Sequence, residues 1–180
     1  MPSLPVPVPR LKPIKSTNQF VLRYSPQCGM TPIAARFVQS ETHPLRPKIL
    51  HMYANRDRNT LWWRVSVNHL PLKRVVRSWC ARRARTAFKQ ALEERGFDPE
   101  GRPLKKEEPS SQTVGLKGTV EIVVNQRSIK EELPAVKEEM ASLVDSLVRA
   151  AQNQGHSSGN KPPEKREKSK PKRRAPDEKF

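Results

Sequence analysis

The sequence predicts one α+β domain flanked by basic, extended segments, and three observations support this class. Apolar and polar residues alternate at 20–24 and 61–68, as is typical of strands. Apolar residues recur at helical spacing in two longer stretches, 71–95 and 133–152. Hydrophobic residues make up only 34% of the 180 residues, below the roughly 45–50% of average globular proteins. We therefore expect a modest core rather than a fully packed chain.

The chain divides into an arm, a domain and a tail. Prolines alternate with small or basic residues in 1–17, which predicts an extended arm. Residues 18–154 form the single domain, in which the polar, proline-containing segment 98–115 is expected to be a flexible loop. Residues 155–180 contain almost no aliphatic side chains, so burial cannot offset their ordering entropy. We expect them to be a disordered basic tail.

The first half of the domain predicts strand, helix and hairpin. Phe20, Leu22 and Tyr24 alternate with Val21 and Arg23, a period-2 pattern that predicts a strand. Thr31 followed by Pro32 is a good start for a short helix, because threonine caps the first turn and proline suits the first helical position. The β-rich runs KILHMYA (48–54) and LWWRVSVN (61–68), joined by a polar link, predict a hairpin.

The second half predicts helix, strand and helix. The helix at 71–95 has a buried stripe, which consists of Val76, Cys80, Ala84, Ala87, Phe88 and Ala91. LKGTVEIVV (116–124) predicts a strand. The last helix is expected to begin near Leu133, because Pro134 suits a first turn. Ser128 and Glu131 offer an alternative capping box, although this start would place Pro134 inside the helix.

The first six elements follow the order of ferredoxin-like folds, β-α-β-β-α-β, with the last helix added. This layout implies a four-stranded antiparallel sheet under two helices. The opening of the domain, with its strand, SPQCGMTP turn (25–32) and short helix, resembles thioredoxin-like mitochondrial ribosomal subunits. That resemblance implies a thioredoxin-like α/β fold as the alternative.

The net charge of +17 is distributed unevenly. Residues 1–92 contain 17 Lys and Arg but only two acids, whereas residues 93–154 are mildly acidic and 155–180 are again basic. This asymmetry predicts a polyanionic partner for the first half, of which RNA, DNA and an acidic membrane surface are the candidates. The acidic surface of the 133–152 helix is left for neighbouring proteins.

The strongest candidate site is the cationic part of the long helix. Seven cations and no acid lie within 17 residues: Lys73, Arg74, Arg77, Arg82, Arg83, Arg85 and Lys89. Like charges this close repel each other, and phosphates would relieve that repulsion. Arginine predominates, which favours bidentate phosphate contacts. The alternative interpretation is a solvated amphipathic helix.

The sheet offers a second candidate surface. If Leu61, Trp63, Val65 and Val67 face the core, then Trp62, Arg64 and Ser66 face outward. By the same alternation, Leu50 and Met52 would face inward and His51 and Tyr53 outward, while Arg23 joins the outward side. Aromatic and arginine side chains on one sheet face suit base stacking and phosphate pairing. The alternative is that another helix, such as the last one, covers this face and makes Trp62 and Tyr53 core residues.

The basic termini bear on RNA contact and on location. The tail run KREKSKPKRR (165–174) adds four candidate RNA-contacting residues: Lys170, Lys172, Arg173 and Arg174. The same run resembles a nuclear localisation signal. Residues 1–40 contain five basic residues and no acid, as mitochondrial targeting segments do. We expect a mitochondrial matrix protein, with the nucleus or nucleolus as the alternative.

Signs of catalysis are scarce in the sequence. The four histidines are scattered, and no zinc-ligand spacing or phosphate-binding glycine loop occurs. Cys28 and Cys80 are expected to be free thiols. Cys28 precedes a helix N-terminus, where a thiol pKa can fall, and this leaves a redox enzyme as a minor alternative. We expect no catalytic residues, cofactor, metal site or membrane span.

These observations together predict a structural RNA-binding component or assembly factor of a large ribonucleoprotein, and in the first place a mitochondrial ribosomal protein that contacts rRNA. A nuclear DNA- or chromatin-associated protein, or a nucleolar RNA-processing protein, is the alternative.

Overall fold

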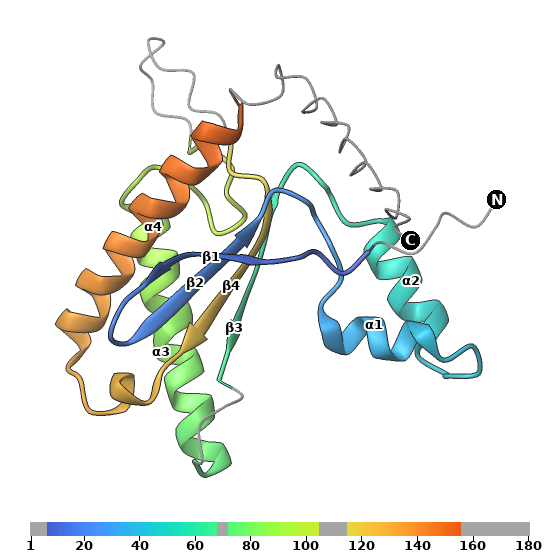
Figure 1. The fold of residues 1–180 in the computed structure, drawn as a ribbon, viewed down its shortest axis with the longest axis horizontal. Coiled ribbons are helices and arrows are strands. Elements are labelled where there is room, and N and C mark those ends of the chain that lie inside the picture. Colours follow the sequence, from blue (N-terminus) through green and yellow to red (C-terminus); the bar gives the residue numbers. More distant parts are fainter. Residues whose placement is uncertain (1–6, 68–71, 105–114, 156–180) are drawn as a thin grey trace, which may run out of the picture.

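A computed structural model describes residues 7–67, 72–104 and 115–155 (Figure 1). Its elements are β1 (Lys12–Ser16), β2 (Phe20–Ser25), α1 (Pro32–Gln39), α2 (Arg46–Ala54), β3 (Leu61–Ser66), α3 (Arg74–Glu93), β4 (Gly118–Val124), a 3₁₀ turn (Gln126–Ile129) and α4 (Leu133–Gly155). The four strands form one mixed sheet in the order β1-β2-β4-β3. The β3–β4 pair is parallel because α3 crosses over between them, whereas the other two pairs are antiparallel. The α+β class is thus confirmed.

Helices α3 and α4 pack against each other and cover one face of the sheet (Figure 1). Alternate residues of the two central strands point into this core, among them Phe20 and Leu22 on β2 and Val120 and Ile122 on β4. The alanines of α3 allow a close approach to α4, whose Val136, Met140, Leu143, Val144 and Leu147 are fully buried. The helical stripes predicted for both helices therefore form the core as expected.

The short helices α1 and α2 lie on the other side of the sheet from α4 (Figure 1). Thr31 caps α1 as predicted, because its Oγ1 accepts the N–H of Ala34 at 3.2 Å. Met30, Ala34 and Val38 pack with Tyr53 of α2 and Trp62 of β3 in a small second core. This second core attaches the helical pair to the start of β3.

The hairpin predicted for 48–54 and 61–68 is wrong, because KILHMYA lies in helix α2. Pro47 sits in the first turn of that helix, where a missing N–H costs nothing. Tyr53 is buried against Trp62, whereas Met52, expected to face inward, is exposed. The ferredoxin-like layout is accordingly not confirmed: no strand forms at 48–54, and β3 and β4 run parallel.

The proline-rich arm contributes a strand that the sequence did not predict. Lys12–Ser16 pairs antiparallel with β2 at the edge of the sheet, with an irregularity between Pro13 and Lys15. Proline is tolerated there because an edge strand leaves one row of N–H groups unpaired. Residues 1–6 of the predicted arm, 105–114 of the predicted loop and 156–180 of the predicted tail lie outside the described residues. The rest of the loop is anchored, since Leu61 donates its N–H to Glu100 O and Leu116 donates to Gly101 O, both at 2.8 Å.

Candidate nucleic-acid interface

A groove of about 400 Å³ lies between the N-terminal half of α3 and the end of β3. It is lined by four arginines, Arg74, Arg77, Arg82 and Arg85. The other residues that line it have smaller side chains: Val67, Ser78 and Ala81. We call Arg74, Arg77, Arg82 and Arg85 the groove arginines.

The pitch of α3 explains why the groove arginines share one surface. Residues three, four, eight and eleven positions apart return to neighbouring angles on an α-helix. Cys80, Ala84 and Phe88 occupy the side that packs on the sheet and α4. The first turns of α3 extend past the end of β3 (Figure 1), so their arginines meet solvent rather than a packed partner.

The groove arginines are electrostatically uncompensated in the described part of the chain. All four are exposed, and none of them forms an ion pair with a described acid. Lys73, just before α3, and Lys89, one turn beyond Arg85, are also exposed. A surface of this kind can bind phosphates in pairs through guanidinium groups, and its own repulsion falls when it does so.

Arg83 differs from the other cations predicted on this helix. Its Nη2 donates a hydrogen bond to Glu131 O at 2.6 Å, and its Nη1 donates to Ser128 O at 3.4 Å. Both acceptors lie in the connection between β4 and α4. Arg83 therefore links α3 to that connection, because both of its Nη groups donate to backbone carbonyls there.

Trp79 is a surface residue that sequence reasoning missed. It is 48% exposed, next to Val75, which is 79% exposed. Together with Arg74, Ser78 and Arg82 they line a second hollow, of about 360 Å³. The sequence did contain a signal: position 79 lies off the buried stripe, next to Cys80, and four residues before an arginine.

The open face of the sheet carries a row of charged side chains across three strands. Glu121 on β4 is paired in register with Arg23 on β2 and with Arg64 on β3. Arg64 Nη2 lies 2.7 Å from Glu121 Oε1, and Arg23 Nη1 lies 3.5 Å from Oε2. The outward positions predicted for Arg23 and Arg64 are confirmed. Their positive charge is partly neutralised, however, by an acid that the sequence analysis did not single out.

The row borders a hollow of about 310 Å³ beneath the start of α1, where Pro32 and Ile33 complete the wall. Helix α4 does not cover this face, because it packs with α3 on the opposite one (Figure 1). The cover that the alternative interpretation required comes from α1 and α2 together, which bury Trp62 at the start of β3.

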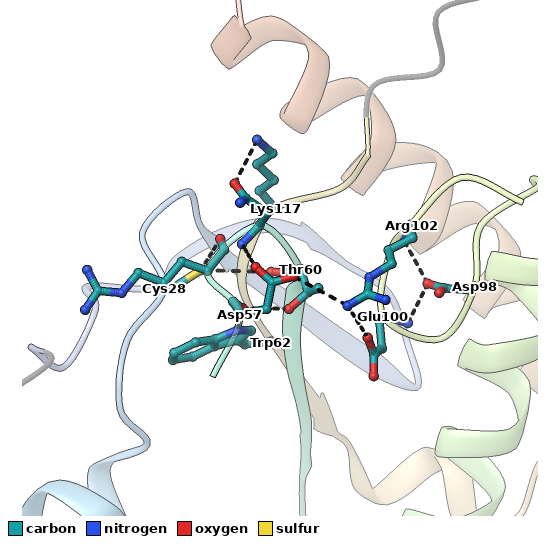
Figure 2. Close-up of polar contacts among 10 residues, drawn as sticks. Cys28, Asp57, Thr60, Trp62, Asp98, Glu100, Arg102 and Lys117 are labelled. Atoms are coloured by element: carbon teal, nitrogen blue, oxygen red, sulfur yellow. Dashed lines mark hydrogen bonds and ion pairs between the residues drawn. The ribbon is translucent and has the colours of Figure 1, made fainter. Parts of the chain in front are cut away.

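Trp62 is the predicted site residue that the structure removes from the surface. It is 3% exposed and lies 5.7 Å from the ring of Tyr53, which is 8% exposed. Its Nε1 donates to Asp57 O at 2.9 Å (Figure 2). The Arg56 guanidinium lies over its ring, with Cζ 4.4 Å from the ring centre. Its outward direction on β3 was correct, but the indole is a core group with no face available for a base.

Cys28 lies beside the turn before β3 (Figure 2). Its Sγ contacts the carbonyl oxygens of Arg58 at 3.3 Å and Thr60 at 3.9 Å. Burial raises the pKa of the Cys28 thiol, the opposite of the lowered value considered from the sequence. Burial also raises the pKa of Cys80. Both cysteines are free thiols, as expected.

The described residues contain neither a metal-binding cluster nor a membrane-spanning helix. No group of three or more His, Cys, Asp or Glu there could hold a metal ion. None of the helices in residues 7–67, 72–104 and 115–155 is long and apolar enough to cross a membrane. The candidate tail residues Lys170, Lys172, Arg173 and Arg174 lie outside the described residues. Comparison of the chain with protein-family models, curated proteins and solved structures found no match.

Proposed function

We propose that this chain is a structural RNA-binding protein, a component or assembly factor of a large ribonucleoprotein such as the mitochondrial ribosome. One observation carries the proposal: four exposed arginines line a single groove with no described acid among them. In the folded protein these like charges repel one another, and a bound polyanion relieves that repulsion.

The dimensions of the groove fit a nucleic-acid backbone. Arg74 and Arg85 are eleven residues apart, which corresponds to about 16 Å along the helix axis. A stretch of this length places several guanidinium groups against successive phosphates. Each phosphate that is neutralised releases bound counterions, so the affinity falls as salt is added.

The surface of α4 supplies a separate place for neighbouring proteins of the particle. Glu139 is engaged with Gln19, and Asp145 with Arg95, so these two acids hold the domain together. Glu131, Glu132 and Glu138 are exposed on or just before the same helix. We assign these three acids to protein contacts rather than RNA contacts, because phosphates repel them.

The salt dependence of RNA affinity tests the proposal. The variant carries Arg→Gln substitutions at all four groove arginines, and the wild type is measured beside it on a structured RNA fragment. If each arginine neutralises one phosphate, the slope of log affinity against log salt decreases in magnitude by about 3. An unchanged slope would show that the groove does not contact the nucleic acid.

A matched control removes four charges from elsewhere on the surface. Lys48, Lys130, Lys137 and Arg149 are exposed and lie outside α3. Their joint substitution by Gln lowers the net charge by the same amount, and we expect at most a small change in slope. An equal loss in both variants would mean that net charge, rather than the groove, drives binding.

The alternative of a nuclear DNA- or chromatin-associated protein is favoured by the basic run at 165–174. Duplex DNA of the same length serves as the competing ligand in the salt titration. Deletion of residues 155–180 then tests the location. Nuclear signal lost on deletion favours the alternative, whereas mitochondrial signal retained after deletion favours the ribosomal proposal.

A further inference from the structure

We propose that the RNA bound at α3 contains an unpaired nucleotide whose base stacks on Trp79. This inference rests on the proposed function and narrows its ligand from polyanions in general to RNA with a single-stranded segment. Three features of Trp79 support it: its indole is exposed, it lies beside the groove arginines, and Arg83 contacts its ring.

The hollow beside Trp79 shares a wall with the arginine groove. Arg74 and Arg82 line both depressions. A nucleotide placed there meets an apolar surface, formed by Trp79 and Val75, with one guanidinium group on either side along the helix, about 12 Å apart in axial rise. A nucleotide carries the matching pair of groups, a flat base and an adjacent phosphate.

Arg83 holds the indole ring in place from one side. Its Cζ lies 5.0 Å from the centre of the Trp79 ring, in a cation–π contact. The guanidinium itself is anchored to the carbonyl oxygens of Ser128 and Glu131. One face of the ring is therefore occupied and restrained, and a base can stack on the other without first ordering a mobile side chain.

The charge and shape of this patch favour an unpaired nucleotide over a duplex or a protein. The bases of a duplex are stacked on one another and present only their edges, whereas looped or single-stranded bases expose their faces to aromatic side chains. A protein that covered Val75 and Trp79 would also bury Arg74 and Arg82, and it would need acids to balance their charge. A nucleotide supplies that balance with its own phosphate.

Two substitutions at position 79 separate stacking from charge. Trp79→Leu keeps an apolar side chain and removes the aromatic face, whereas Trp79→Phe retains a smaller one. The probes are oligoadenylate of about 12 nucleotides and a blunt-ended RNA duplex with the same number of phosphates and no unpaired base. For Trp79→Leu we expect the oligoadenylate affinity to fall about 5- to 150-fold, with little change for the duplex and an unchanged salt slope. Trp79→Phe should recover most of the loss.

The outcomes distinguish this inference from the proposed function. If the groove variant lowers the salt slope but Trp79→Leu binds oligoadenylate like the wild type, RNA binding stands and stacking at Trp79 is wrong. If the groove variant leaves the slope unchanged, the proposed function itself fails. Equal losses of affinity for oligoadenylate and for the duplex would also overturn the inference, because a stacking role predicts a loss for unpaired RNA alone.

Tryptophan fluorescence gives an independent readout. The chain has three tryptophans: Trp62 is buried, Trp63 donates its Nε1 to Pro99 O at 2.7 Å, and Trp79 is exposed. Stacking of adenine on Trp79 should quench part of the emission, and Trp79→Phe should abolish this RNA-dependent change. Quenching that persists in Trp79→Phe would contradict the assignment.

Discussion

Arg64 Nη2 lies 2.7 Å from Oε1 of Glu121, its register partner across the parallel pair of β3 and β4. Arg23 reaches the other oxygen of the same carboxylate from β2. The side chain of Glu121 is only 10% exposed, so its charge depends on these two arginines rather than on water. The row ties three strands together on the face that α3 and α4 leave open.

Replacing Glu121 by Gln should therefore destabilise the fold. The amide keeps the shape of the side chain but leaves two arginines side by side without their common acid. We expect the free energy of unfolding to fall by about 1–3 kcal/mol, as measured by urea denaturation. Glu138→Gln, on the exposed surface of α4, is the control and should change it by less than about 0.5 kcal/mol. If both variants lost the same unfolding free energy, the charged row of Arg23, Glu121 and Arg64 would make no specific contribution to stability.

Arg83 and Arg77 should respond in opposite ways to the same substitution. Arg83→Gln removes hydrogen bonds to two backbone carbonyls and should lower the free energy of unfolding by about 1 kcal/mol. Arg77→Gln removes only repulsion from neighbouring arginines and should be neutral or slightly stabilising. In RNA binding, Arg77→Gln should lower the salt slope. A slope that falls more for Arg83→Gln than for Arg77→Gln would contradict the division of roles.

The parts of the fold that could be predicted are those with strong periodicity. Helices α3 and α4 each bury one long apolar stripe, so spacing alone located them, and Leu133 was identified as the start of α4. Helix α2 could not be recognised in this way, because only Tyr53 is buried in it and its apolar residues do not form one stripe. β1 was missed because nothing in its short sequence, which contains one proline and two lysines, indicates the pairing with β2.

The site was predictable as charge but not as geometry. The clustering of cations in 73–89 indicated the surface of α3 correctly. Which arginine is engaged depends on the carbonyls of Ser128 and Glu131, more than 40 residues away, and no local pattern reveals them. Trp62 and Trp79 differ for a similar reason: helices α1 and α2 cover the first, whereas the second lies off the buried stripe of α3 and is exposed.

Gly118 should tolerate alanine less well than Gly96 does. Both have positive φ, +105° and +79°, where a side chain strains the backbone. A Cβ at Gly118 would also lie 2.3 Å from Ser25 O, whereas a Cβ at Gly96 would meet no atom within 4 Å. Gly96→Ala should cost about 1 kcal/mol of unfolding free energy, and Gly118→Ala clearly more. Equal losses in thermal or urea unfolding would mean that the start of β4 can move away from β2.

The two thiols should be poorly reactive at neutral pH. Burial raises the pKa of Cys28 and of Cys80, so each remains protonated where an ordinary cysteine has begun to ionise. We expect iodoacetamide to modify the Cys28 peptide more slowly in the folded protein than in urea at pH 7.5, as followed by mass spectrometry. Rapid modification in the folded state would indicate an activated thiol and would revive the redox alternative.

The same shifts give stability a defined dependence on alkaline pH. A pKa raised by folding favours the protonated form in the native state, so its contribution is complete below the unfolded value of about 8.5 and is lost as the pH rises through the folded value. Tyr24 adds to this trend at higher pH, because burial, and then the charge of an ionised Cys28, raises its pKa as well. We expect the urea midpoint to fall above about pH 8.5, and to fall less steeply in Cys28→Ala. A midpoint that rises with alkaline pH would mean that the Cys28 thiolate is stabilised by Arg56 and Arg58 rather than penalised by burial.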